Sequence, residues 1–181
     1  MMILILSMFI IETQIQEIIL YKFPFNKSIS NWRIVDDGVM GGRSQGGISM
    51  SPDNTVIYSG NISLDNNGGF SSLRLRISEL NISKVNAVKL RIKADSKNYQ
   101  FRIKKSHFDR HSYVNEFSTG NEWQEIIIPF KELKPQFRGR KLNMPVFNGS
   151  SIGEIAFLIG NKVEESFLLE IDSISLIKIE E

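Results

Sequence analysis

The sequence predicts an all-β protein, a sandwich of about ten short antiparallel strands. Apolar and polar residues alternate with period two in several segments, most clearly over residues 88–94, which is typical of strands with one buried face. Turn signals such as residues 65–69 (Asp-Asn-Asn-Gly-Gly) separate these segments. Helical periodicity is almost absent, and the chain of 181 residues fits a single sandwich domain.

The N-terminal segment differs from the rest in composition. Residues 1–11 read MMILILSMFII, and an apolar run of this length suits an export signal. No Lys or Arg precedes the run, and no small-residue cleavage site follows it. We therefore interpret residues 1–19 as a degenerate signal peptide or a short helix, with export slightly favoured over a cytoplasmic location. Residues 20–181 are assigned to the β-sandwich.

The expected strands follow one another along this domain. They cover residues 19–25, 32–35, 56–64, 70–77, 88–94, 99–104, 113–117, 123–130, 155–159 and 167–179. Pro129 is expected to end its strand, because proline has no N–H for a central ladder. Residues 131–133 are expected to form one helical turn, and residues 135–149 to be irregular. The uneven strand lengths and this long connection favour a sandwich over a closed barrel.

A glycine-rich stretch, residues 36–47, stands out between two of these strands. Five of its twelve residues are glycine, yet Val39 and Met40 lie at its centre. A flexible linker would combine glycine with polar residues, so this composition predicts an ordered loop. No Gly-Lys-Ser/Thr motif and no helix follow, which argues against a phosphate-binding loop.

Catalytic and metal-binding patterns are weak. The chain has no cysteine and two histidines, His107 and His111, in a polar segment expected to be a loop. We interpret them as exposed side chains. Asp36, Asp37 and Asp65 offer oxygen atoms of the kind that Ca²⁺ prefers, but their spacing does not require a calcium site. The sequence therefore predicts a non-enzymatic protein without a cofactor.

The charge and hydropathy of the chain limit the kinds of partner that we expect. The net charge of +2 argues against nucleic acid. No run approaches the ~20 apolar residues of a membrane-spanning helix. The basic cluster 138–141, beside Phe137, is interpreted as solvated surface, with a carboxylate-binding patch as the alternative.

Several motifs resemble those of the complex I intermediate-associated protein 30 family. The most specific are Trp32 with residues 37–44 (DGVMGGRS) and residues 67–74 (NGGFSSLR). Weaker matches follow in the same order, at residues 99–102, 123–130, 137–140 and 167–171. The resemblance covers about residues 21–179 and the chain has the short form of bacterial members. It implies a galactose-binding-like jelly-roll sandwich and a non-enzymatic role, since mitochondrial members act as assembly factors for respiratory complex I.

We therefore expect a binding or chaperone-like module that recognises a protein partner. The candidate binding residues come from the motifs, and they are Asp36, Asp37, Gly38, Met40, Gly41, Gly42, Arg43, Gly69, Phe70, Arg74 and Arg138. We expect the two glycine-rich turns to be adjacent and the arginines to pair with Asp36 or Asp37. The alternative is that these residues form a buried network that only stabilises the edge of the sandwich.

The rival function is carbohydrate binding, in which exposed aromatic side chains on a concave face would stack on sugar rings. The available aromatic residues are Trp32, Tyr58, Tyr99, Tyr113 and Trp123. Two or more exposed on one face would favour this function, whereas burial would count against it.

Overall fold

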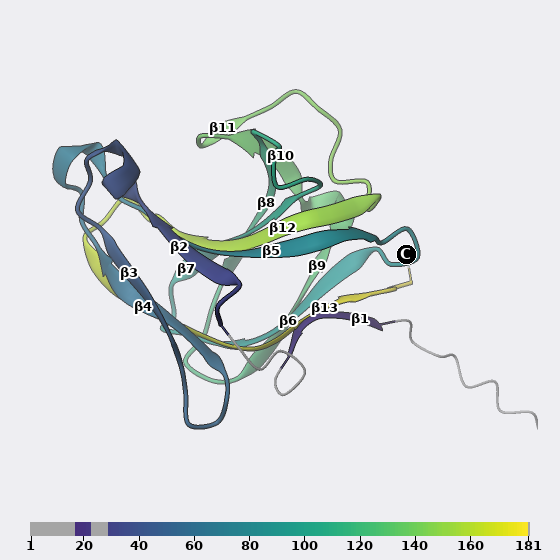
Figure 1. The fold of residues 1–181 in the computed structure, drawn as a ribbon, viewed down its shortest axis with the longest axis horizontal. Coiled ribbons are helices and arrows are strands. Elements are labelled where there is room, and N and C mark those ends of the chain that lie inside the picture. The colour runs from purple at the N-terminus through teal and green to yellow at the C-terminus, as the bar shows by residue number, and fades with distance from the viewer. Residues whose placement is uncertain (1–16, 23–28, 181) are drawn as a thin grey trace, which may run out of the picture.

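The computed structural model describes residues 17–22 and 29–180, which form two antiparallel β-sheets packed face to face (Figure 1). The six-stranded sheet has the order β3-β4-β13-β6-β9, and β1 also pairs with β13. Its strands are β1 (Glu17–Lys22), β3 (Gln45–Met50), β4 (Val56–Ile62), β6 (Ala87–Lys93), β9 (Gln124–Pro129) and β13 (Glu165–Ile177).

The seven-stranded sheet has the order β11-β10-β8-β7-β12-β5-β2. Its strands are β2 (Trp32–Asp36), β5 (Ser71–Asn81), β7 (Asn98–Lys104), β8 (Ser112–Ser118), β10 (Lys134–Phe137), β11 (Arg140–Lys141) and β12 (Ser151–Ile159). Three short 3-10 helices complete the described elements: η1 (Asp37–Met40), η2 (Asp65–Asn67) and η3 (Phe130–Glu132). The expected all-β jelly-roll sandwich is confirmed.

The core lies between the sheets and is built by the predicted alternation. Leu90 and Ile92 of β6 are buried, as are Phe101 of β7 and Phe157 of β12, whose rings meet at 5.4 Å. Pro129 is the last residue of β9, as its missing N–H predicts, and η3 follows it.

Three segments differ from the sequence-based expectation. β3 was not among the expected strands, and it begins at Gln45, inside the glycine-rich stretch 36–47 that was expected to be a loop. β1 begins at Glu17 and pairs with β13, so the sandwich starts earlier than residue 20, while residues 1–16 lie outside the described part. The region expected to be irregular contains the β10–β11 hairpin. Its turn is made by Arg138 and Gly139, both with positive φ (49° and 75°), the geometry of a type I′ hairpin turn.

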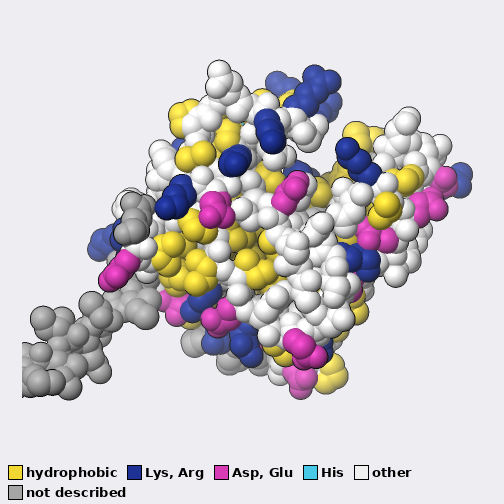
Figure 2. Space-filling view, turned by 180° about the vertical axis from the view of Figure 1, so that it is seen from behind, with side chains coloured by type: hydrophobic (Ala, Val, Ile, Leu, Met, Phe, Trp, Pro, Cys, Tyr) yellow, Lys and Arg dark blue, Asp and Glu magenta, His cyan; other side chains and the backbone are white. Residues whose placement is uncertain are grey.

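The fold presents two features that could act as a site. One end of the sandwich carries η1 and η2 side by side (Figure 1). The outer face of the seven-stranded sheet is exposed between this end and the β10–β11 hairpin, and two surface depressions lie on it. From behind, the lobe with η1 and η2 and the lobe with the hairpin are separated by a notch (Figure 2).

Candidate functional site

The buried side chain of Asp37 joins the two glycine-rich turns. Its carboxylate accepts hydrogen bonds from the backbone N–H of Ser44 (2.9 Å), the Ser44 hydroxyl (2.5 Å) and the backbone N–H groups of Gly69 (2.6 Å) and Phe70 (3.3 Å). The backbone N–H of Asp37 also donates to the Phe70 carbonyl oxygen (3.3 Å). The predicted adjacency of the two turns is therefore confirmed.

The glycines in these turns make room for that carboxylate. A Cβ atom on Gly42 would lie 2.4 Å from the carboxylate carbon of Asp37, and one on Gly68 would lie 2.5 Å from its Oδ2 atom. Gly41 has a different role, because it ends η1 in the left-handed conformation (φ 91°). The turns thus need glycine partly for backbone geometry and partly for close packing.

Asp37 is held as a carboxylate, and no cation of the described residues pairs with it. Burial acts to raise the pKa of Asp37, but the hydrogen bonds from Ser44, Gly69 and Phe70 outweigh it and hold that pKa below its ordinary value. Asp36 is satisfied in a similar way, by the N–H of Gly46 (3.0 Å) and the hydroxyl of Ser71 (2.5 Å).

The expected pairing of the arginines with Asp36 or Asp37 is wrong, because backbone and hydroxyl donors already occupy both carboxylates. Arg43 instead pairs with Asp65 (3.3 Å), and both side chains are exposed. Arg74 lies on the outer face of the seven-stranded sheet, 3.8 Å from Glu154. Arg138 is at the β10–β11 turn, with its guanidinium over the Phe137 ring. Arg74 and Arg138 therefore do not join the converged turns.

Three apolar side chains are exposed on the joined turns, and we call Val39, Met40 and Leu64 the motif tip. Val39 and Met40 belong to η1 and are 74% and 61% exposed, and Leu64 precedes η2. The Asn66 side-chain amide donates to the Gly41 carbonyl oxygen (3.0 Å), which links η2 to η1. Figure 2 shows hydrophobic side chains on the surface of this lobe. Met40 and Arg43 thus both face solvent rather than the core.

The residues considered for metal binding form no metal site in the described part of the chain. Within residues 17–22 and 29–180, no three His, Asp or Glu side chains form a group that could hold a metal ion. The ring of His107 lies against Phe108, and the ring of His111 lies against Tyr113.

Among the described residues, no helix has the length and apolar character needed to cross a bilayer.

The five aromatic residues considered for sugar stacking are mostly in the core. Trp32, Tyr58, Tyr99 and Tyr113 are buried, and Trp123 is 36% exposed with the Arg91 guanidinium 5.6 Å from its ring centroid. The criterion of two exposed rings on one face is therefore not met by this set.

A second polar cluster was missed by sequence reasoning. Glu154 of β12 is 2% exposed, and its carboxylate lies 2.8 Å from Arg33, 3.8 Å from Arg74 and 3.8 Å from Lys104. The available signal was a single acidic residue inside the apolar run 152–159, where a carboxylate needs a partner. The cations come from β2, β5 and β7, so their convergence depends on strand order.

Comparison with known proteins identifies relatives of the chain. A family model described as complex I intermediate-associated protein 30 matches residues 21–171. The mitochondrial protein of that name from Mus musculus is 25% identical, and the match covers 87% of this chain and 55% of the mouse protein. An uncharacterised Schizosaccharomyces pombe protein is 30% identical over 78% of this chain and 74% of its own length. This chain thus spans about half the length of the mouse relative.

Solved structures with the same architecture include carbohydrate-binding modules. The family 11 module of a cellulosomal cellulase from Clostridium thermocellum superposes with a TM-score of 0.67 over 93% of this chain and 98% of the module, at 19% identity. An agarase superposes with a TM-score of 0.58 over 91% of this chain and 25% of the enzyme, at 12% identity. At these identities the similarity establishes the fold.

Proposed function

From the premise that the chain belongs to the complex I intermediate-associated protein 30 family, we propose that it is a non-enzymatic binding module that holds a protein partner at the motif tip. The name of the mouse relative describes association with intermediates of complex I. By analogy, the partner proposed here is a protein complex during its assembly.

The exposure of Val39 and Met40 on a rigid support carries this proposal. A loop free to relax would turn two large apolar side chains toward the core, because burial of apolar surface is favourable. Here the loop is held by the four hydrogen bonds to the Asp37 carboxylate, and the two side chains stay in solvent. A loop backbone that is already held in place loses little conformational entropy when a partner covers it, which favours binding.

The polar rim of the motif tip supports the same function. Arg43 and Asp65 flank it and are both exposed, so they are available to a partner beyond their own pair. Protein interfaces commonly combine an apolar centre with such a polar rim.

Site-specific crosslinking in the native cell tests the proposal. The photoreactive residue p-benzoyl-phenylalanine replaces Met40 in one variant and Ile127, which is exposed on β9, in a control variant. We expect the variant at residue 40 to crosslink to a subunit of an assembling complex and the control to lack that product. If residue 40 gives no protein adduct, or the same adducts as residue 127, the motif tip is not the binding surface.

A second candidate function, carbohydrate binding, is favoured by a hollow on the outer face of the seven-stranded sheet. This hollow of about 210 Å³ is lined partly by Asn98, Gln100, Glu116 and Asn161, whose amide and carboxylate groups are suited to sugar hydroxyls. Calorimetric titration with neutral oligosaccharides tests it. Heat of binding that disappears in Gln100→Ala would support the function, and absence of heat with the wild type would exclude those sugars.

A further inference from the structure

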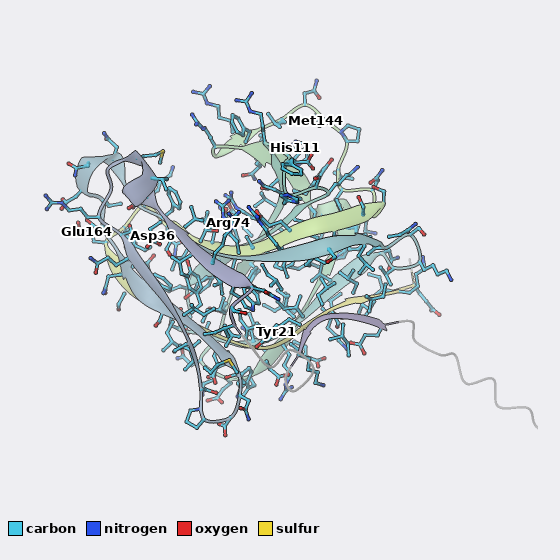
Figure 3. The ribbon with its side chains drawn as sticks, viewed as in Figure 1. Tyr21, Asp36, Arg74, His111, Met144 and Glu164 are labelled. Atoms are coloured by element: carbon cyan, nitrogen blue, oxygen red, sulfur yellow. The ribbon has the colours of Figure 1, made fainter. Side chains whose placement is uncertain are left out.

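A row of basic residues crosses the outer face of the seven-stranded sheet. In the strand register, Ala156 of β12 pairs with Arg74 of β5 on one side and with Arg102 of β7 on the other, and Arg74 also pairs with Arg33 of β2. Lys104 is two residues beyond Arg102 on the same face of β7. Figure 3 places Arg74 between the lobe with Asp36 and the lobe with His111 and Met144.

Carboxylates on this face do not balance the cations. Glu154 is bonded to Arg33 at 2.8 Å, while its distances to Arg74 and Lys104 are both 3.8 Å, beyond hydrogen-bond range. Glu116 faces Arg102 from β8, but its carboxylate accepts a hydrogen bond from Gln100 (2.9 Å). Among the described residues, four cations thus face the carboxylates of Glu154, Glu116 and, beside Lys104, Asp109, and the hydrogen bond from Arg33 to Glu154 is the one that joins a cation to a carboxylate here.

The two arginines beside Ala156 are insufficiently bonded for their burial. Within the described part of the chain, the guanidinium of Arg102 bonds only to the neutral side-chain oxygen of Gln100, from Nε at 3.0 Å and from Nη2 at 2.5 Å. Burial first, and then the nearby charge of Arg74, lower the pKa of Arg102 to about 10. The Nε atom of Arg74 is buried and has no hydrogen-bond partner among residues 17–22 and 29–180. Leaving such charged donors unsatisfied destabilises the protein unless something else completes them.

We propose that this face binds an oxyanion, a carboxylate or phosphate group carried by a ligand, over Ala156 and between Arg74 and Arg102. Ala156 is buried, and a small depression of about 20 Å³ at this point is lined by Arg74, Arg102, Lys104, Glu154 and Ala156. Guanidinium groups bind carboxylate and phosphate oxygens through paired N–H donors, and the ammonium of Lys104 adds a further donor. This site is separate from the motif tip and does not depend on it.

A purely structural role for the cluster makes a different prediction from a binding role. If Arg102 served only the fold, its removal would destabilise the protein. If it is kept for a ligand, replacing a buried and poorly paired cation with an apolar side chain of similar length leaves the ligand-free protein as stable or makes it more stable.

Thermal unfolding with and without anions tests the proposal. The probes are inorganic phosphate, tri-galacturonic acid as a carboxylate and tri-galactose as its neutral counterpart, all at matched ionic strength. The variants are Arg102→Met and the control Lys141→Met, which removes one exposed charge from β11. We expect phosphate or tri-galacturonic acid to raise the Tm of the wild type and of Lys141→Met by several degrees. Arg102→Met should show no rise, and its anion-free Tm should equal or exceed that of the wild type.

The pattern of responses identifies the anion. A rise in Tm with phosphate alone indicates a phosphate-bearing ligand, and a rise in Tm with tri-galacturonic acid alone indicates a carboxylate-bearing ligand. Ala156→Glu serves as a second variant, since it would place a carboxylate between the two arginines and should abolish the anion response. The proposal is overturned if neither anion raises the wild-type Tm, if tri-galactose raises it equally, or if Arg102→Met and Ala156→Glu keep the response.

Discussion

The carboxylate of Asp37 lies 2.6 Å from the backbone nitrogen of Gly69, although the two residues are 32 positions apart in the chain. This contact joins the turn after β2 to the turn before β5. It lies at the end of the sandwich, beyond the part where these two strands pair. A buried carboxylate bonded to several backbone N–H groups is stable without a cation, because those groups point their positive ends at it. The two turns therefore behave as one rigid unit.

Asp37→Asn should lower the free energy of unfolding by about 2–4 kcal/mol. The amide has one acceptor oxygen in place of two, and in either orientation its NH₂ group would face a backbone N–H, that of Ser44 or those of Gly69 and Phe70. Urea unfolding measures the change. Asp65→Asn is the control, because its pair with Arg43 is exposed and should contribute little. Equal losses in the two variants would contradict the central role of Asp37.

Gly42→Ala should destabilise the protein by about 1–3 kcal/mol, since the new methyl group would overlap the Asp37 carboxylate. Gly38→Ala is a matched control four residues away, where a Cβ meets no atom of the described residues within 4 Å and φ is not positive. Its stability should be unchanged or slightly higher. Thermal unfolding of both variants checks the difference, and a similar Tm for the two would contradict the close packing.

Lowering the pH should remove the contribution of Asp37 to the free energy of unfolding. Its pKa is lower in the folded protein than in the unfolded chain, so the unfolded state binds more protons as the pH falls. The stabilisation is complete above the unfolded pKa, about 3.9, and is lost as the pH falls through the folded pKa.

Because the pKa of Glu17 is also lowered, by hydrogen bonds from Lys89 and Ser175, the quantity to measure is the stability difference between wild type and Asp37→Asn. That difference should be constant near neutral pH and should shrink below about pH 4. A difference that is independent of pH across this range would show that the two states bind the Asp37 proton equally.

Replacing both Val39 and Met40 with serine should leave the free energy of unfolding within about 0.5 kcal/mol of the wild type, because both side chains are exposed. The same double variant should lose the partner that crosslinks to residue 40. Unfolding curves and competition in the crosslinking assay provide the two readouts. A large loss of stability would instead mean that these side chains pack within the protein.

The alternation of apolar and polar residues was sufficient to predict the sandwich and most of its strands. Period-two burial is a local property of each strand, and β6 and β7 show it directly. The β10–β11 hairpin was missed because its turn is Arg138-Gly139, a weaker signal than Asn-Gly, and because Pro135 argued against a strand.

Some features of the candidate site could be predicted from the sequence, and others depend on contacts between distant parts of the chain. The adjacency of the two glycine-rich turns was predicted, through the motifs that they carry. The partners of Asp37 were not, because its carboxylate is bonded by backbone N–H groups whose positions exist only after β2, β3 and β5 have assembled. Every residue except proline carries a backbone N–H, so residue type does not show which N–H groups will bond a given carboxylate.

The row of basic residues on the outer face of the seven-stranded sheet also could not be predicted from the sequence. Arg33, Arg74 and Arg102 are far apart in the chain, and each looks like an ordinary exposed residue of an alternating strand. Strand order and register place them on either side of Ala156. Local patterning therefore specified which face is polar in the alternating strands, such as β6 and β7, because that depends on neighbouring residues alone. Which charges meet across that face was set by the pairing of distant strands, a property of the folded chain as a whole.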